Sequence, residues 1–240
     1  MEEPERIAIT ICGDGGCGKS SITLRLVHQE WTNGYDPTIE DSYTLSLAHP
    51  PTSKTYTLSL TDTAGQEEYR SLFSATSLST ADAFLLVYDI TSAPSLDALD
   101  YFHDLITMEA ETRDERHHVP PVCVVAGNKC DLQSARQVRS AVGLEWARQR
   151  GYGFMETSAR EMVNVHETFA LIISRVVEAR AAHRLRENPP VSSAAADGAG
   201  GEAGTSNRAE KHQTVDSVDL EDRPGHKTQR GGFWARLKCW

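Results

Sequence analysis

The sequence predicts an α/β fold, in which helices cover both faces of a mostly parallel β-sheet that carries one antiparallel hairpin strand. Short apolar runs alternate with longer helical patterns over residues 5–186, an order typical of right-handed crossovers between parallel strands. Two stretches, residues 83–90 and 120–131, contain continuous apolar runs, as expected for parallel strands buried on both faces. In such sheets, ligands bind at the carboxyl ends of the strands.

The individual elements follow from local patterns, taken in chain order. RIAITIC (6–12) is typical of a strand, and KSSITLRLVHQEW (19–31) has a helical pattern after Gly-rich punctuation. Residues 43–62 alternate apolar and polar positions on either side of a Pro-containing turn, which predicts a β-hairpin. The remaining predicted elements are helices at 95–110, 137–150 and about 165–186, and a short strand at 154–159.

The last part of the chain differs in composition from the rest. PPVSSAAADGAGGEAGTSN (189–207) is small, Gly-rich and without periodicity, so it cannot bury enough surface to offset its ordering entropy. We therefore expect a domain at 5–186 and a flexible, disordered tail at 187–240. The chain has 240 residues, of which 39% are hydrophobic, a low value for a fully globular chain that agrees with this division.

Charge and cysteine content narrow the classes of function. The formal net charge of −10 argues against nucleic acid as the main partner, because phosphate neutralisation needs a cationic face. The five cysteines show neither paired spacing nor a C-x-x-C motif, which favours reduced thiols in an intracellular protein. No signal segment and no apolar run of about 20 residues is found, so we expect a cytoplasmic protein unless something else attaches it to a membrane.

The clearest motif is GDGGCGKS (Gly13–Ser20), which matches the phosphate-binding pattern G-x-x-x-x-G-K-[ST]. Its glycines let backbone N–H groups curl around phosphate oxygens, while Lys19 would reach the β- and γ-phosphates and Ser20 would hold Mg²⁺. The alternative is an ordinary Gly-rich turn, but the motif lies between a strand and a helix, as its mechanism requires. Alone, it fits ATPases, kinases and GTPases.

A second motif, NKCD (Asn128–Asp131), follows an apolar strand and bears on the choice of base. A carboxylate can accept two parallel hydrogen bonds from the N1–H and 2-amino groups of guanine, a pair that adenine does not present. Asp131 would therefore select guanine. The alternative is a strand-to-helix turn in which the aspartate is a cap.

A third motif, DTAGQEEY (Asp62–Tyr69), begins at the end of the second hairpin strand. Asp62 is placed to contact Mg²⁺ through water, as carboxylates do in phosphoryl-transfer sites. The N–H of Gly65 could contact a γ-phosphate, and Gln66 is the candidate for positioning the attacking water. The alternative is a plain turn.

Together with YDPTIEDSY (Tyr35–Tyr43), these motifs resemble the Ras superfamily of small GTPases, and the switch stretches resemble the Ras family in particular. The resemblance covers roughly residues 5–182 and implies a P-loop NTPase-type fold. It implies a signalling switch that binds GTP or GDP with Mg²⁺ and slowly hydrolyses GTP to GDP and phosphate. The implied partners are a guanine-nucleotide exchange factor, effector proteins, and a GTPase-activating protein that supplies an arginine in trans.

The resemblance also implies a role for each matching position. The catalytic set would be Gln66, Thr38, Lys19 and Gly65, and Mg²⁺ would be held by Ser20, Thr38 and, through water, Asp62. The nucleotide-binding residues would be Gly13, Asp14, Gly15, Gly16, Cys17, Gly18, Lys19, Ser20, Ser21, Trp31, Tyr35, Pro37, Thr38, Gly65, Asn128, Lys129, Asp131, Ser158, Ala159 and Arg160. The effector-facing edge would consist of Ile39, Glu40, Asp41, Ser42 and Tyr43.

The chain departs from the family pattern at several places. Trp31 stands where the family usually has Phe, and Arg160 where Ras usually has Lys. AHPPTSK (48–54) makes the hairpin connection longer, and EAETRDERHHV (109–119) lengthens the segment before the guanine-recognition strand. The stretch at 70–84 diverges from Ras, which leaves open which exchange factor and activating protein act on this chain.

Two rival functions remain at this point. One is a GTP-bound scaffold with little cycling, and the other is a P-loop enzyme that uses ATP, such as a small kinase. The Asn128–Asp131 motif argues against ATP. Gly15, where a side chain would crowd Gln66 and the incoming arginine, is intact, as is Gln66 itself. This argues against a dead or constitutively active GTPase.

The last ten residues, GGFWARLKCW (231–240), combine cations, aromatics and a cysteine. Only Trp240 follows Cys239, whereas a prenylated C-a-a-X box needs three residues after the cysteine. No acidic residue follows Asp222, so the cations and aromatics favour an anionic membrane surface. We interpret Cys239 as a lipidation site in a sequence two residues short of the box, at the cytoplasmic face of the plasma membrane or an internal membrane. The alternative is a frayed, disordered end.

Overall fold

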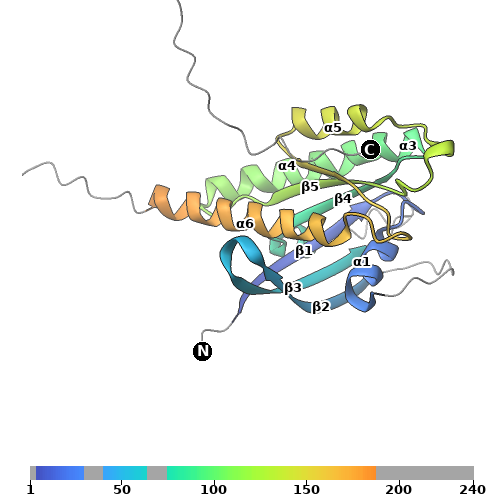
Figure 1. Ribbon diagram of the computed structural model, residues 1–240. Coiled ribbons are helices and arrows are strands. Elements are labelled where there is room, and N and C mark those ends of the chain that lie inside the picture. The colour runs from blue at the N-terminus through green and yellow to red at the C-terminus, as the bar shows by residue number, and fades with distance from the viewer. Residues whose placement is uncertain (1–3, 30–39, 64–74, 188–240) are drawn as a thin grey trace, which may run out of the picture. The chain divides into compact units, whose positions relative to one another are not determined.

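The computed structural model describes residues 4–29, 40–63 and 75–187, and its centre is a six-stranded sheet (Figure 1). The strands lie in the order β2-β3-β1-β4-β5-β6. Only the β2–β3 pair is antiparallel; every other neighbouring pair is parallel. The strand bounds are β1 Glu5–Gly13, β2 Glu40–His49, β3 Lys54–Thr63, β4 Ala83–Asp89, β5 Val122–Asn128 and β6 Gly153–Glu156.

Helices cover both faces of this sheet and enclose a core on each side (Figure 1). The apolar sides of α1 and α6 pack against one face, which includes the alternate β1 residues Ile7, Ile9 and Ile11. The apolar sides of α3, α4 and α5 pack against the other face, which includes Phe84 and Leu86 of β4. The helix bounds are α1 Lys19–His28, α2 Ala75–Thr80, α3 Ala93–Asp97, α4 Leu99–Glu115, α5 Ser140–Gln149 and α6 Val165–Glu187, with short 3₁₀ turns at Pro50–Thr52 and Gln133–Ala135.

The predicted fold class is confirmed, while several element bounds differ from the sequence pattern. The helix expected at 137–150 begins only at Ser140, because the N–H groups of Gln137 and Val138 both donate to the carbonyl of Ile90, at 2.9 Å. The helix expected at 95–110 is two helices that meet at Ala98, and the second continues to Glu115. Within the described ranges, no helix combines the length and apolar character needed to cross a bilayer.

The parallel arrangement brings the carboxyl ends of five strands to one edge of the sheet. β1 ends at Gly13, β3 at Thr63, β4 at Asp89, β5 at Asn128 and β6 at Glu156. The phosphate-loop and base-recognition motifs directly follow two of these ends, and Asp62 lies one residue before a third. The fold therefore brings to one edge of the sheet those predicted site residues that the structure describes, as expected for an open α/β sheet. The predicted tail, including Cys239, lies outside the described residues.

Candidate nucleotide-binding site

The phosphate loop connects β1 to α1, and its backbone requires glycine at two close approaches. Gly13 and Gly18 have positive φ angles of 146° and 94°, which L side chains rarely adopt. A Cβ on Gly13 would lie 2.1 Å from the Val87 carbonyl oxygen, and one on Gly18 would lie 2.3 Å from Nδ2 of Asn128. The two glycines thus let the loop lie directly against β4 and the base-recognition motif.

Lys19 is the first residue of α1 and carries the charge of this loop. Its side chain is buried, and Nζ donates a hydrogen bond to the Asp14 carbonyl oxygen at 3.0 Å. The ammonium group is thereby held over the loop, beside the positive end of the α1 dipole, where anionic phosphates are stabilised. Gly15 and Gly16 are exposed at the tip of the loop, and a Cβ on Gly16 would meet nothing within 4 Å.

Asn128 links the base-recognition motif to the phosphate loop. Its Nδ2 donates to the Cys17 carbonyl oxygen at 2.9 Å, and its Oδ1 accepts from the Thr157 hydroxyl at 3.2 Å and the Ala159 N–H at 3.3 Å. Asn128 is 2% exposed, so these bonds form away from water, where a lost partner is costly. One side chain therefore fixes three loops relative to one another.

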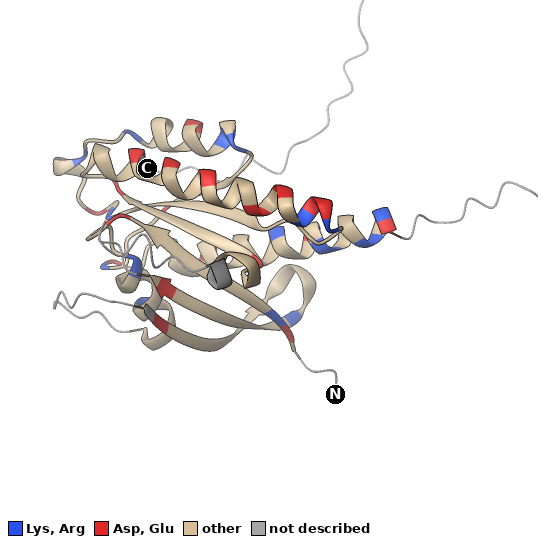
Figure 2. Cartoon of the chain, turned by 180° about the vertical axis from the view of Figure 1, so that it is seen from behind, with Lys and Arg blue, Asp and Glu red and all other residues tan. Residues whose placement is uncertain are grey.

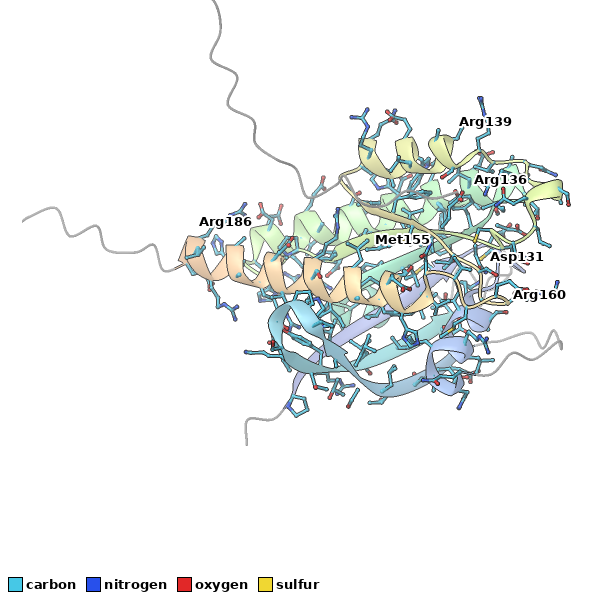
Figure 3. The ribbon with its side chains drawn as sticks, in the orientation of Figure 1. Asp131, Arg136, Arg139, Met155, Arg160 and Arg186 are labelled. Carbon is cyan, nitrogen blue, oxygen red and sulfur yellow. The ribbon has the colours of Figure 1, made fainter. Side chains whose placement is uncertain are left out.

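The side chains that would face the base are also held by partners. Asp131 accepts a hydrogen bond from the Ser158 hydroxyl at 2.6 Å, and that hydroxyl accepts one from the Glu161 N–H at 3.0 Å. Asp131 and Arg160 lie at the same end of the molecule, opposite to Arg186 (Figure 3). Arg160 is largely exposed and pairs with Glu161 at 3.5 Å.

Lys129 adopts a left-handed backbone conformation with φ 63°, and its Nζ lies 2.6 Å from Oδ2 of Asp89. Burial opposes ionisation of Asp89, but hydrogen bonds from Lys129 and Thr91 outweigh it and lower the pKa of this carboxyl. Asp89 and Thr157 are not among the site residues predicted from the sequence. Asp89 could have been found from its position, because it is the last residue of β4 just as Asn128 is the last residue of β5.

Asp62 differs from these residues because its carboxylate is buried and poorly satisfied by the protein. It is 1% exposed, and neither of its carboxylate oxygens has a hydrogen-bond partner among the described residues. Burial raises its pKa to about 6, although the neighbouring Ser20 hydroxyl and Lys19 charge act to lower it. The strand end beside it is fixed, since the Thr63 hydroxyl donates to the Ile11 carbonyl oxygen at 2.7 Å.

This orphaned carboxylate fits a magnesium ion. Mg²⁺ prefers oxygen ligands and is usually bound through one or two carboxylates, waters and substrate phosphates. Asp62 and Ser20 lie beside each other next to the phosphate loop and supply such oxygens. Within the described ranges, no three His, Cys, Asp or Glu side chains form a metal-holding cluster.

Several predicted site residues fall outside the described ranges and stay predictions. They are Trp31, Tyr35, Pro37, Thr38, Ile39, Gly65 and Gln66. Of the predicted effector edge, residues 40–43 lie at the start of β2, the outermost strand on its side of the sheet. Asp41 pairs with Asp62 across the β2–β3 ladder, so this edge and the predicted magnesium position are adjacent.

Comparison with known proteins finds a matching family and many individual relatives. The model of the Ras family matches residues 8–178. The Ras-like protein 1 of Saccharomyces cerevisiae is 39% identical over 168 residues, which are 70% of this chain and 52% of that protein. The chain therefore spans about half the length of this curated relative.

Proposed function

This chain belongs to the Ras family, and from that premise we propose that it is a small GTPase acting as a signalling switch. It would bind GTP or GDP with Mg²⁺ and slowly hydrolyse GTP to GDP and phosphate. The observation that carries the proposal is the Asn128 link. It connects the motif that would read guanine to the loop that would hold phosphates, so that one ligand can occupy both.

The nucleotide assignment rests on the surroundings of Asp131. Its carboxylate is oriented by Ser158 through one oxygen, Oδ1, and would accept hydrogen bonds from the N1–H and 2-amino groups of guanine. The backbone N–H groups of Ser158 and Ala159 belong to the same region. Asp131→Asn should shift binding from guanine toward xanthine nucleotides, measured by competition with mant-GDP. Wild-type protein that binds ATP as tightly as GTP would overturn the assignment.

For hydrolysis, the residues of this chain would orient and stabilise rather than form a covalent bond. A water held by Gln66 and the Thr38 carbonyl would attack the γ-phosphorus in line, and the bond to the β–γ bridging oxygen would break, releasing GDP and phosphate. Lys19 and the loop N–H groups would stabilise the transferring charge. Mg²⁺, held by Ser20, Thr38 and, through water, Asp62, would neutralise negative charge on the phosphates.

The proposed partners are an exchange factor, an activating protein that supplies an arginine, and effectors at the exposed β2 edge. Single-turnover hydrolysis with and without a Ras-type activating protein separates a cycling switch from a GTP-bound scaffold. Acceleration supports the switch. If no such activating protein accelerates hydrolysis, the GTP-bound scaffold is favoured.

We also propose that the C-terminal residues bring the protein to an anionic membrane at the cytoplasmic face of the plasma membrane or an internal membrane. The support is the sequence, with cations and aromatics around Cys239 and no acidic residue after Asp222. Cell fractionation of the wild-type chain and its Cys239→Ser variant tests this. Identical soluble distributions would overturn a lipid anchor.

A further inference from the structure

Arg113 lies in the 109–119 stretch, which lengthens the chain relative to the family pattern. In the structure this stretch extends α4 to Glu115. Acidic positions recur along α4 (Figure 2), but the Arg113 side chain is only 11% exposed. A buried guanidinium must be paired and hydrogen-bonded, and its partners show what it does here.

Two hydrogen bonds of Arg113 join α4 to the end of α2, and a third contact lies within α4. Nη1 donates to the Ala81 carbonyl oxygen at 2.9 Å, and Nη2 donates to the Leu78 carbonyl oxygen at 2.7 Å. Nε pairs with Glu109 of its own helix at 2.8 Å, which fixes the plane of the guanidinium. The side chain therefore holds the backbone of another element at two points, three residues apart.

These bonds satisfy backbone carbonyl groups at the C-terminal end of α2. The last carbonyls of a helix have no partners within the helix, and a cation near them is favourable. α2 has six residues and no basic residue in its last turn, so α4 supplies the cation. A planar fork can satisfy two carbonyls at once, whereas a lysine offers only a point charge.

The position of α2 in the chain gives this contact a functional consequence. Gly65 and Gln66, the proposed γ-phosphate and water-positioning residues, lie between Thr63 and α2. Thr63 is fastened to β1 by its hydroxyl. The other end is fastened at Ala81 by Arg113, and the next residue, Asp82, donates its N–H to the Ala8 carbonyl oxygen at 2.8 Å.

We propose that Arg113 is a positioning residue for GTP hydrolysis, acting through the C-terminal end of α2 without touching nucleotide. The inference rests on the proposed GTPase function. Displacements of about 1 Å at a catalytic group can cost on the order of 100-fold in rate, so a contact one step removed should contribute roughly 10-fold. Nucleotide affinity should change little, because none of Arg113's bonds reaches the phosphate loop or the base-recognition motif.

The test compares Arg113→Gln and Arg113→Lys with a matched control, Arg150→Gln, in the full chain. Arg150 is a half-buried arginine that pairs with Asp100 of α4 at 2.8 Å and donates a hydrogen bond to the Trp146 carbonyl oxygen of α5 at 3.1 Å. Neither contact involves α2. The measurements are single-turnover GTP hydrolysis, GDP affinity, and hydrogen exchange of the backbone amides of residues 75–82 in the GDP-bound protein.

We expect Arg113→Gln to slow hydrolysis roughly 10-fold and to speed exchange at residues 75–82, with GDP affinity within about 2-fold of wild type. Arg113→Lys should show a smaller loss of hydrolysis rate and a smaller increase in exchange than Arg113→Gln. Arg150→Gln should change neither, even if it lowers the melting temperature. Equal hydrolysis rates in wild type and both Arg113 variants would overturn the proposal, as would an equal slowing in Arg150→Gln.

The two exchange outcomes separate this inference from the proposed function. If the wild-type chain hydrolyses no GTP but Arg113→Gln speeds exchange at residues 75–82, the clamp on α2 stands and the GTPase proposal fails. If exchange is unchanged, the clamp itself is wrong. Should Arg113→Gln not fold, Glu109→Gln provides a milder change, because it frees the guanidinium plane and leaves both carbonyl bonds possible.

Discussion

The guanine side and the magnesium side of the candidate site are built in opposite ways. On the guanine side, Asn128, Lys129 and Asp131 all bond to other protein groups. On the magnesium side, Asp62 is buried with neither carboxylate oxygen hydrogen-bonded among the described residues. A buried polar group without a partner costs about 1–3 kcal/mol. The guanine side is therefore organised by the fold alone, whereas the fold bears a cost at Asp62 that a cation would relieve.

The largest expected effect is on the magnesium side. Asp62→Ala should weaken Mg²⁺ binding by about 100-fold, because groups that act on a metal through bound water typically contribute 10–100-fold. The free energy of unfolding in EDTA should not fall, since removing the carboxylate also removes the cost of burying it. Mg²⁺ titration of nucleotide release measures the first effect and urea denaturation the second.

Asp41→Ala is the matched control for that change. Asp41 is directly opposite Asp62 in the β2–β3 ladder and carries the same charge, but it is exposed. Its removal should alter Mg²⁺ binding by less than about 3-fold. If both variants weaken Mg²⁺ equally, general negative charge rather than Asp62 holds the ion.

On the guanine side, removal of a site residue should lower both nucleotide affinity and the stability of the metal-free protein. Asn128→Ala breaks three bonds and leaves the Cys17 carbonyl and Ala159 N–H without that partner, so both GDP affinity and metal-free stability should fall. At about 0.7 kcal/mol net for each of the three bonds, we expect a loss of roughly 2 kcal/mol, or about 30-fold in affinity. Isothermal titration and urea denaturation measure the two effects.

Thr157→Val offers a graded control for this prediction. It removes only the hydroxyl that donates to Oδ1 of Asn128 and keeps the volume of the side chain. It should cost about a third of the Asn128→Ala effect. A loss of GDP affinity without any loss of stability in Asn128→Ala would mean that the link is not structural.

The fold and the motifs can be predicted from the sequence, but the difference between the guanine side and the magnesium side cannot. The hairpin, the apolar strands and the phosphate loop carry local periodicity or spacing, and their prediction needs no long-range contact. The Asn128 link depends on which side chains the crossovers bring together, as does the close approach of Gly18 to Asn128. The same applies to the Arg113 contact with α2. The burial of Asp62 also depends on neighbours distant in sequence, so its raised pKa has no sequence signal.

That raised pKa gives the third prediction. With a folded pKa of about 6, the Asp62 carboxyl takes up a proton in competition with Mg²⁺ as the pH falls. Between pH 7.5 and 5.0, Mg²⁺ affinity should drop about 10-fold, and Asp62→Ala should lose this dependence. An unchanged affinity at pH 5.0 would show that the carboxyl is ionised without the metal.

The smallest expected effect is on the free energy of unfolding. To measure it, the titration of Asp62 must be distinguished from that of a second group, His49. Because the pKa of Asp62 is raised on folding, its contribution favours the metal-free fold at low pH and is lost as the pH rises through about 6. His49 acts in the opposite direction. It is buried at the end of β2, where Nδ1 is 3.0 Å from the Thr52 hydroxyl and Nε2 is 2.8 Å from the Ser174 hydroxyl. Burial lowers its pKa, so the unfolded chain takes up a proton first.

Below pH 6.5, protonation of His49 should therefore lower the free energy of unfolding, while protonation of Asp62 raises it. The pH dependence of the wild-type protein shows only the net result of these two opposing effects. His49→Gln should cost about 1 kcal/mol at pH 7.5, from weakened hydrogen bonds. In EDTA, its free energy of unfolding should then rise more steeply than that of wild type as the pH is lowered from 7.5 to 5.5. The double variant with Asp62→Ala should lose this rise. If His49→Gln alone keeps the wild-type slope, His49 does not titrate in this range, and the pH dependence belongs to the magnesium side.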